Sequence, residues 1–141
     1  MTESSFDLDT ANALLNDVIA PWVKDLNITV EAVDSQGATL RMQYSDRLCR
    51  EGGIICGQAL MALADTAMVI AVSSASSGYR PMTTVDMTTH MMKPMSNTDV
   101  LAQTTILRLG RSMAFGNTQL RPANNPKPAV TCTLAYALLP G

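Results

Sequence analysis

Hydrophobic residues recur along this chain with two different periods, one typical of helices and one typical of strands. Near the N-terminus, several apolar residues fall on one helical stripe: Leu14, Leu15, Val18, Ile19 and Trp22. Their spacing predicts an amphipathic helix over 9–23, with Asp9 or Thr10 capping its start.

Six later segments have the composition and alternation of strands. The first two, 28–33 and 39–44, flank turn residues at 35–37 and predict a hairpin. Four more follow at 83–92, 100–109, 113–120 and 129–138. Long strands joined by short turns predict an antiparallel sheet.

Between the hairpin and the last four strands lies the most apolar stretch, 54–72, which follows a glycine-rich turn and ends in a polar run at 73–78. Its length approaches that of a membrane span, but Gly57, Gln58 and Asp65 interrupt it, so a buried helix is the better interpretation. A helix that is apolar nearly all round must be wrapped by the sheet, which indicates an α+β fold.

Asp65 is the single acid of this helix. Burying a carboxylate costs several kcal/mol unless something compensates its charge. The residue is therefore either paired across an interface or held in place for chemistry.

The composition of the chain limits its expected domain organisation, assembly, partners and compartment. The 141 residues fit one domain over 1–141, in which 1–24 forms an N-terminal helical segment. With 47% hydrophobic and only 16% charged residues, the chain is expected to hide surface in an oligomer. A net charge of −2 argues against nucleic acid as a partner. Three cysteines and an acidic, polar N-terminus predict a cytoplasmic protein.

Four segments carry a resemblance to a known family. Residues 53–58 (Gly-Ile-Ile-Cys-Gly-Gln) and 63–67 (Leu-Ala-Asp-Thr-Ala) match its pattern G-x-x-H-G-G followed by L-A-D-T-A. Residues 84–94 match a strand that closes on Arg/Lys-Pro, and 108–112 match an R-x-G-R turn. The chain thus resembles hotdog-fold acyl-CoA thioesterases of the 4-hydroxybenzoyl-CoA and phenylacetyl-CoA (PaaI-like) type.

This resemblance implies a hotdog fold, a curved antiparallel sheet wrapped around one central helix. It implies that Asp65 is the catalytic carboxylate, acting as general base or nucleophile, and that the N–H of Gly57 polarises the thioester carbonyl. Free N–H groups at a helix start do stabilise a developing oxyanion. It further implies a homodimer or homotetramer that completes the site across its interface, and an acyl-CoA substrate.

Around these two residues, the resemblance suggests substrate contacts at Cys56 and Gln58, where the family usually has His and a second Gly. The Asn or Gln that members often carry at the position of Arg50 is also absent. Arg108 and Arg111, with Lys93, are candidates for the phosphates of coenzyme A, although solvated surface charges fit them equally.

One histidine and scattered cysteines give no ligand spacing, so we expect no metal, and no prosthetic group or membrane is expected either.

Three alternatives stay open at this stage. The chain could be a catalytically weak hotdog protein that binds acyl-CoA or an acyl-carrier protein, or a structural oligomer with an unreactive Asp65. A nucleophilic pair of Cys56 and His90 is a third possibility, because spacing says nothing about contact.

Overall fold

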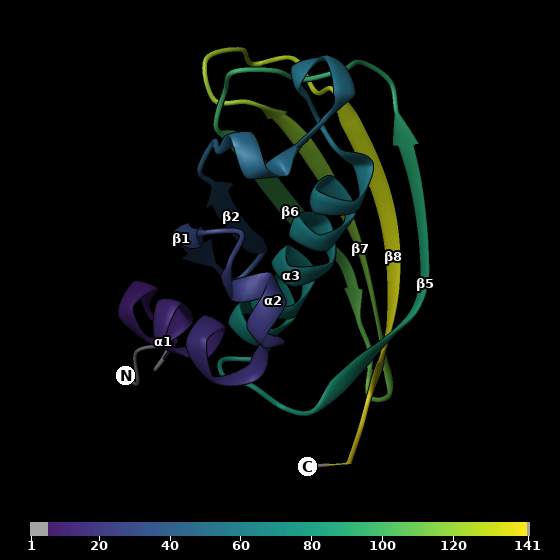
Figure 1. The fold of residues 1–141 in the computed structure, drawn as a ribbon. Coiled ribbons are helices and arrows are strands. Elements are labelled where there is room, and N and C mark those ends of the chain that lie inside the picture. The colour runs from purple at the N-terminus through teal and green to yellow at the C-terminus, as the bar shows by residue number, and fades with distance from the viewer. Residues whose placement is uncertain (1–5, 141) are drawn as a thin grey trace.

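A computed structural model describes residues 6–140, which form one curved antiparallel sheet around a central helix (Figure 1). The sheet has six strands in the order β1-β2-β6-β7-β8-β5. Their bounds are Ile28–Asp34 (β1), Gly37–Met42 (β2), Met82–Met91 (β5), Val100–Leu109 (β6), Met113–Pro122 (β7) and Val130–Leu138 (β8). All neighbouring strands pair antiparallel. The predicted α+β hotdog architecture is confirmed.

The helix α3 (Gly57–Ala75) is the core of the molecule. By length and composition it is the one helix among the described residues that could cross a membrane, yet about two-thirds of it is buried, as in the core helix of a soluble fold. Gly78 lies just beyond its end with φ +155°, a conformation that favours glycine.

The helix begins later than the hydrophobic run suggested. Ile54 and Ile55 form a short strand, β4, which pairs with β3 (Cys49–Arg50) ahead of the helix. Continuous apolar residues do not distinguish a short buried strand from a helix, so periodicity alone placed this boundary too early.

The N-terminal helix is also shorter than predicted. It is divided into α1 (Leu8–Val18) and α2 (Pro21–Lys24), because Pro21 lacks an amide donor and forces the residue before it out of the helical region. Asp7 caps α1 by accepting from the Thr10 amide at 2.8 Å, so the predicted caps were wrong. Trp22, predicted on the buried stripe, is 59% exposed, since it lies beyond the break.

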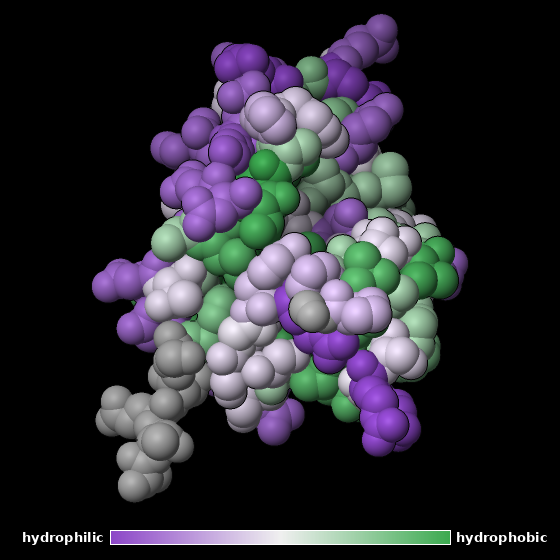
Figure 2. All heavy atoms as spheres, turned by 90° about the horizontal axis from the view of Figure 1, so that it is seen from below, coloured by the Kyte–Doolittle hydropathy of each residue, from purple (hydrophilic) through white to green (hydrophobic). Residues whose placement is uncertain are grey.

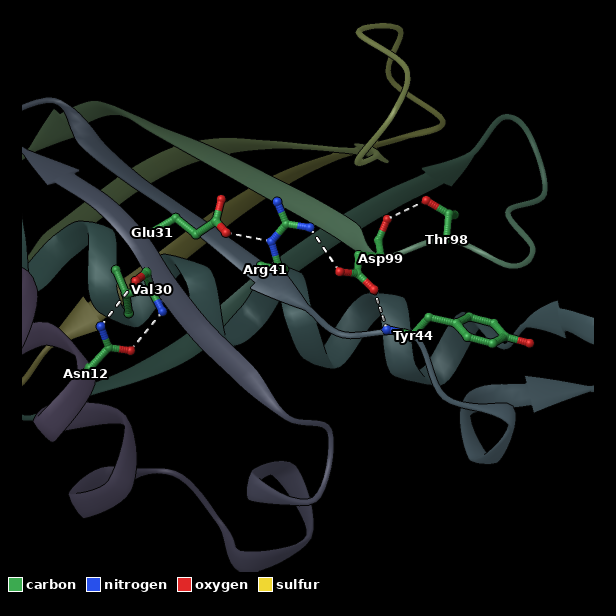
Figure 3. A network of polar contacts seen from close by, with 7 residues as sticks. All are labelled: Asn12, Val30, Glu31, Arg41, Tyr44, Thr98 and Asp99. Atoms are coloured by element: carbon green, nitrogen blue, oxygen red, sulfur yellow. Dashed lines mark hydrogen bonds and ion pairs between the residues drawn. The ribbon is translucent and has the colours of Figure 1, made fainter.

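Polar contacts fasten the first two strands (Figure 3). Asn12 of α1 pairs with both backbone groups of Val30, at 2.9 and 3.1 Å, and so covers part of the edge of β1. Arg41 of β2 bridges Glu31 and Asp99. The Tyr44 amide and the Arg41 guanidinium hold the pKa of Asp99 below its usual value. These contacts fix the end of the sheet farthest from β5.

Candidate active site

Asp65 lies at the middle of α3 and is half-buried, with buried residues directly before and after it in the helix. Its carboxylate oxygen Oδ1 accepts a hydrogen bond from Thr84 Oγ1 of β5 at 2.8 Å. The same oxygen accepts a second bond from the Tyr136 hydroxyl of β8 at 2.5 Å. The structure thus places the one acid of the core helix against two hydroxyl donors from two adjacent strands.

The charge of Asp65 is compensated by hydroxyl groups and not by a cation. In the part of the chain that the structure describes, the ion pairs are those of Arg41 with Glu31 and Asp99. Burial raises the pKa of Tyr136 above its usual range, and the neighbouring Asp65 charge adds to that effect. Tyr136 therefore stays protonated and continues to donate at physiological pH.

The start of α3 is the second part of the candidate site. Cys56 occupies the N-cap position, and its side chain makes no capping hydrogen bond. The first backbone amides of the helix, beginning at Gly57, are therefore not capped by that side chain. Gln58 is exposed on the first turn and Cys56 is half-buried. These open N–H groups carry the partial positive charge that stabilises an oxyanion.

A cavity of about 300 Å³ opens beside Gly57. Its wall is mostly apolar, with two cations: Ile54, Ile55, Leu60, Met91, Pro94 and Met95 line it together with Arg50 and Lys93. The Met91 side chain lies so close to Gly57 that a Cβ there would come within 3.0 Å of its sulfur. Glycine at this position leaves room for the cavity mouth beside the helix start.

The two elements are separated within one chain. Asp65 follows Gly57 by eight residues, which corresponds to about 12 Å along the helix axis. A single thioester carbonyl cannot contact both the Gly57 amide and the carboxylate at that separation. The structure therefore keeps these two predicted site residues apart.

Arg108 and Arg111 do not lie with Gly57, Cys56 and Gln58. In the register of the sheet, Arg108 lies opposite Phe115 of β7, which lies opposite Ala135 of β8. Met91, which lies close to Gly57, is opposite Val130 of β8. Five residues along a strand span about 17 Å. Arg108 pairs with Phe115, whose neighbours face α3, so it points to the opposite side of the sheet. Both arginines are exposed.

His90 and Cys56 are likewise not joined within the chain. Met91 faces Gly57, and strand alternation turns the adjacent His90 to the other face of β5, where it is level with Thr131. Among the described residues no hydrogen bond links the histidine to the thiol. The Cys56–His90 pair finds no support in this geometry.

Sequence reasoning missed the two residues that hold Asp65. Thr84 stands at the start of the strand motif 84–94, but as one of several threonines it carries no distinguishing signal. Alternation along β8 does predict that Tyr136 faces the helix with Leu134 and Leu138. A buried tyrosine needs a partner for its hydroxyl. That requirement is the signal that could have indicated a polar group on α3.

Comparisons with known proteins agree with this architecture. The family model of the thioesterase superfamily matches residues 52–129, more than half of the chain. The chain therefore belongs to the thioesterase superfamily, a class of thioester hydrolases with the hotdog fold. A comparison with curated protein sequences found no significant match.

Solved structures of the same fold cover nearly the whole chain. A candidate thioesterase from Silicibacter sp. TM1040 is 27% identical, with a TM-score of 0.86 over 98% of this chain and 95% of that one. A thioesterase from Haemophilus influenzae is 22% identical, with a TM-score of 0.84 over 96% and 92%. Zebra fish thioesterase superfamily member 2 is 21% identical, with a TM-score of 0.84 over 96% and 100%.

Proposed function

We propose that this protein hydrolyses an acyl-CoA thioester to a carboxylic acid and free coenzyme A, as PaaI-like thioesterases do. Asp65 acts as general base or nucleophile, and the Gly57 amide stabilises the oxyanion. The observation that carries the proposal is the Asp65 carboxylate, the one acid of a buried helix, which two hydroxyl groups hold and which pairs with no cation of residues 6–140.

In the general-base form, Asp65 takes a proton from water as the water oxygen attacks the thioester carbon. The carbonyl oxygen becomes an oxyanion at the helix start. The intermediate then collapses, the C–S bond breaks, and the proton passes from Asp65 to the departing sulfur. This sequence consumes one water, needs no metal or prosthetic group, and brings coenzyme A in only as part of the substrate.

The separation of Gly57 and Asp65 supports a site shared by two subunits. Because the two groups lie about 12 Å apart in one chain, Asp65 would act with the helix start of a partner. A homodimer, or a tetramer of such dimers, brings them together.

The strand β5 offers the surface for that association. It is the last strand of the sheet, it spans ten residues, and among the described strands it pairs with β8 alone. Apolar side chains are exposed on it and just after it: Val85, Met91 and Met92. Seen from below, hydrophobic surface reaches the side of the molecule where β5 lies (Figure 2). An unpaired edge of this kind is a ready site for pairing with a second copy.

The cavity beside Gly57 supports an amphipathic substrate. Its apolar wall suits an acyl or pantetheine chain, and the cations Arg50 and Lys93 suit the phosphates of coenzyme A. Arg108 and Arg111 would reach the same substrate only from a partner subunit. The cysteines Cys49, Cys56 and Cys132 are all free thiols, which fits a reducing cytoplasm.

A second function is favoured by the residues at the helix start. Cys56 and Gln58 replace the family's His and Gly, and such a site could bind an acyl-CoA or an acylated carrier protein with little turnover. Saturable binding without release of free thiol would select this function.

The test is the release of free thiol from a panel of acyl-CoAs of different chain length, by the wild-type protein and by Asp65→Asn. The asparagine keeps the shape of the side chain and removes the base. We expect turnover to fall by about a hundredfold or more, with an unchanged circular dichroism spectrum. Near-normal turnover in the variant would refute Asp65 as the catalytic group.

A further inference from the structure

The Tyr136 hydroxyl is the closest donor to the Asp65 carboxylate. Tyr136 is 2% exposed, and its ring fills the space between β8 and α3. Its hydroxyl lies 2.5 Å from Asp65 Oδ1 and 2.9 Å from the Asp65 carbonyl oxygen. One hydroxyl proton serves one acceptor at a time, and the carbonyl alone would satisfy the hydroxyl. The shorter contact to Oδ1 is therefore additional to what burial of a tyrosine requires.

Both donors converge on the same carboxylate oxygen. Thr84 and Tyr136 each bind Oδ1, and no hydrogen bond of the described residues goes to Oδ2. The terminal torsion of an aspartate is broad, so without such bonds the two oxygens would exchange places easily. The two bonds leave one defined oxygen, Oδ2, with all of its lone pairs unused.

We propose that Tyr136 is a positioning residue that, together with Thr84, holds Asp65 Oδ1 so that Oδ2 alone receives the proton of the attacking water or attacks the thioester. This inference rests on the proposed function of Asp65. Correct orientation of a catalytic group is worth a large part of a rate enhancement, because a misplaced base reacts only in a fraction of its conformations.

Tyr136 suits this task because it remains a donor. The groups that face its hydroxyl are Asp65 of α3, Thr84 of β5 and, on its own strand, the Cys132 thiol. Burial and the Asp65 charge both raise the pKa of the phenol. The hydroxyl therefore keeps its proton and continues to donate to Asp65 at physiological pH.

Tyr136→Phe removes the hydroxyl and keeps the ring. We expect kcat on the best acyl-CoA to fall roughly tenfold or more with KM within about twofold, because the lost contact orients a base and does not bind substrate. Tyr44→Phe is the matched control, because its hydroxyl bonds Asp46 outside the site. Its kcat and KM should stay unchanged.

A purely structural tyrosine would behave differently. It would lower the melting temperature of the variant without lowering kcat, and that result would overturn the proposal. The double variant Tyr136→Phe/Asp65→Asn gives an independent measure. If Tyr136 acts through Asp65, the second substitution costs little further activity, whereas a full additional loss contradicts the inference.

The two variants distinguish failure of the proposed function from failure of the positioning role alone. If Asp65→Asn itself retains turnover, the proposed function fails. If Asp65→Asn is inactive and Tyr136→Phe has normal kcat, only the positioning role fails. If Tyr136→Phe does not fold, Thr84→Val at an exposed position of β5 removes the other donor to Oδ1. An unchanged kcat in that variant would overturn the two-donor arrangement.

Discussion

At the scale of single side chains, the proposed chemistry rests on Asp65 and the two hydroxyl groups that bind it. The helix supplies an apolar surrounding, and two hydroxyls supply the only polar contacts to the carboxylate side chain among the described residues. These hydrogen bonds offset part of the free-energy cost of burying the carboxylate. They do so without pairing its charge with a cation. The two hydroxyl donors thus hold the carboxylate through one oxygen, as the proposed role of Asp65 requires.

Cys56 gives a prediction at the same scale. The residue is half-buried at the N-cap of α3, next to Gly57, whereas Cys132 is 1% exposed and burial raises the pKa of its thiol. We expect iodoacetamide to modify Cys56 well before Cys132 and to reduce turnover by blocking the space beside Gly57. Peptide mass spectrometry combined with the thiol-release assay measures both effects.

The control for this prediction is Cys56→Ser. Because the chemistry is assigned to Asp65, the serine variant should keep most of its activity and become resistant to the reagent. Loss of turnover in Cys56→Ser, with activity retained in Asp65→Asn, would instead favour the thiol as nucleophile, and His90→Ala should then reproduce the loss.

At the scale of elements, the sheet positions both donors to Asp65 by its strand order. β5 and β8 are neighbours at one end of the sheet, and their register places Thr84 directly opposite Tyr136. At the other end, β1 and β2 cover the remaining side of α3. The proposed site therefore also depends on the close packing of β1 and β2, although neither strand supplies a residue to it.

Gly37 tests how tight that packing is. A Cβ at this position of β2 would lie 1.8 Å from the Thr104 carbonyl oxygen of β6, a backbone atom that cannot swing away. Gly37→Ala should lower the free energy of unfolding by about 2–3 kcal/mol or more, because strand pairing must shift to admit the methyl group. Urea unfolding followed by circular dichroism measures the change.

Gly110→Ala is the graded comparison, since its Cβ would lie 3.1 Å from the Met113 carbonyl oxygen and needs only a small adjustment. It should be clearly less destabilising than Gly37→Ala. Equal stability of the two variants would contradict the close approach of β2 and β6.

At the scale of the whole molecule, the proposed site needs a second chain. Gly57→Pro tests the other half of the site, because proline at the first helical position removes the N–H and remains compatible with the helix. Gly57→Ala keeps the N–H, meets the same Met91 side chain, and should retain more activity. Sedimentation at micromolar concentration should show a dimer or larger assembly.

Coexpression of Asp65→Asn with Gly57→Pro, each inactive alone, then separates a shared site from a site within one chain. Half of the randomly assembled dimers contain one chain of each kind, and each of these has one intact site of two, so about a quarter of wild-type turnover should return. No recovery in purified mixed dimers, or a fully active monomer, would refute the shared site.

The sequence by itself determined the local elements and the main candidates of the site. The apolar run with one acid predicts the core helix, and alternation predicts the six long strands, because both signals repeat within a few residues of the chain. Pro21 also indicates the break between α1 and α2, but the hydrophobic stripe continues across it and predicts a single helix. Asp65 and Gly57 were found because they belong to one continuous motif.

Tertiary structure alone decided what surrounds Asp65. Tyr136 lies 71 positions away in the sequence and Thr84 lies 19 positions away, and they meet because β5 joins the sheet beside β8 and not beside β6. Strand order and register are set by the packing of the whole sheet on α3, which no local period encodes. The separation of Gly57 from Asp65, on which the proposal of a site shared by two subunits rests, likewise follows from the single helix that carries both.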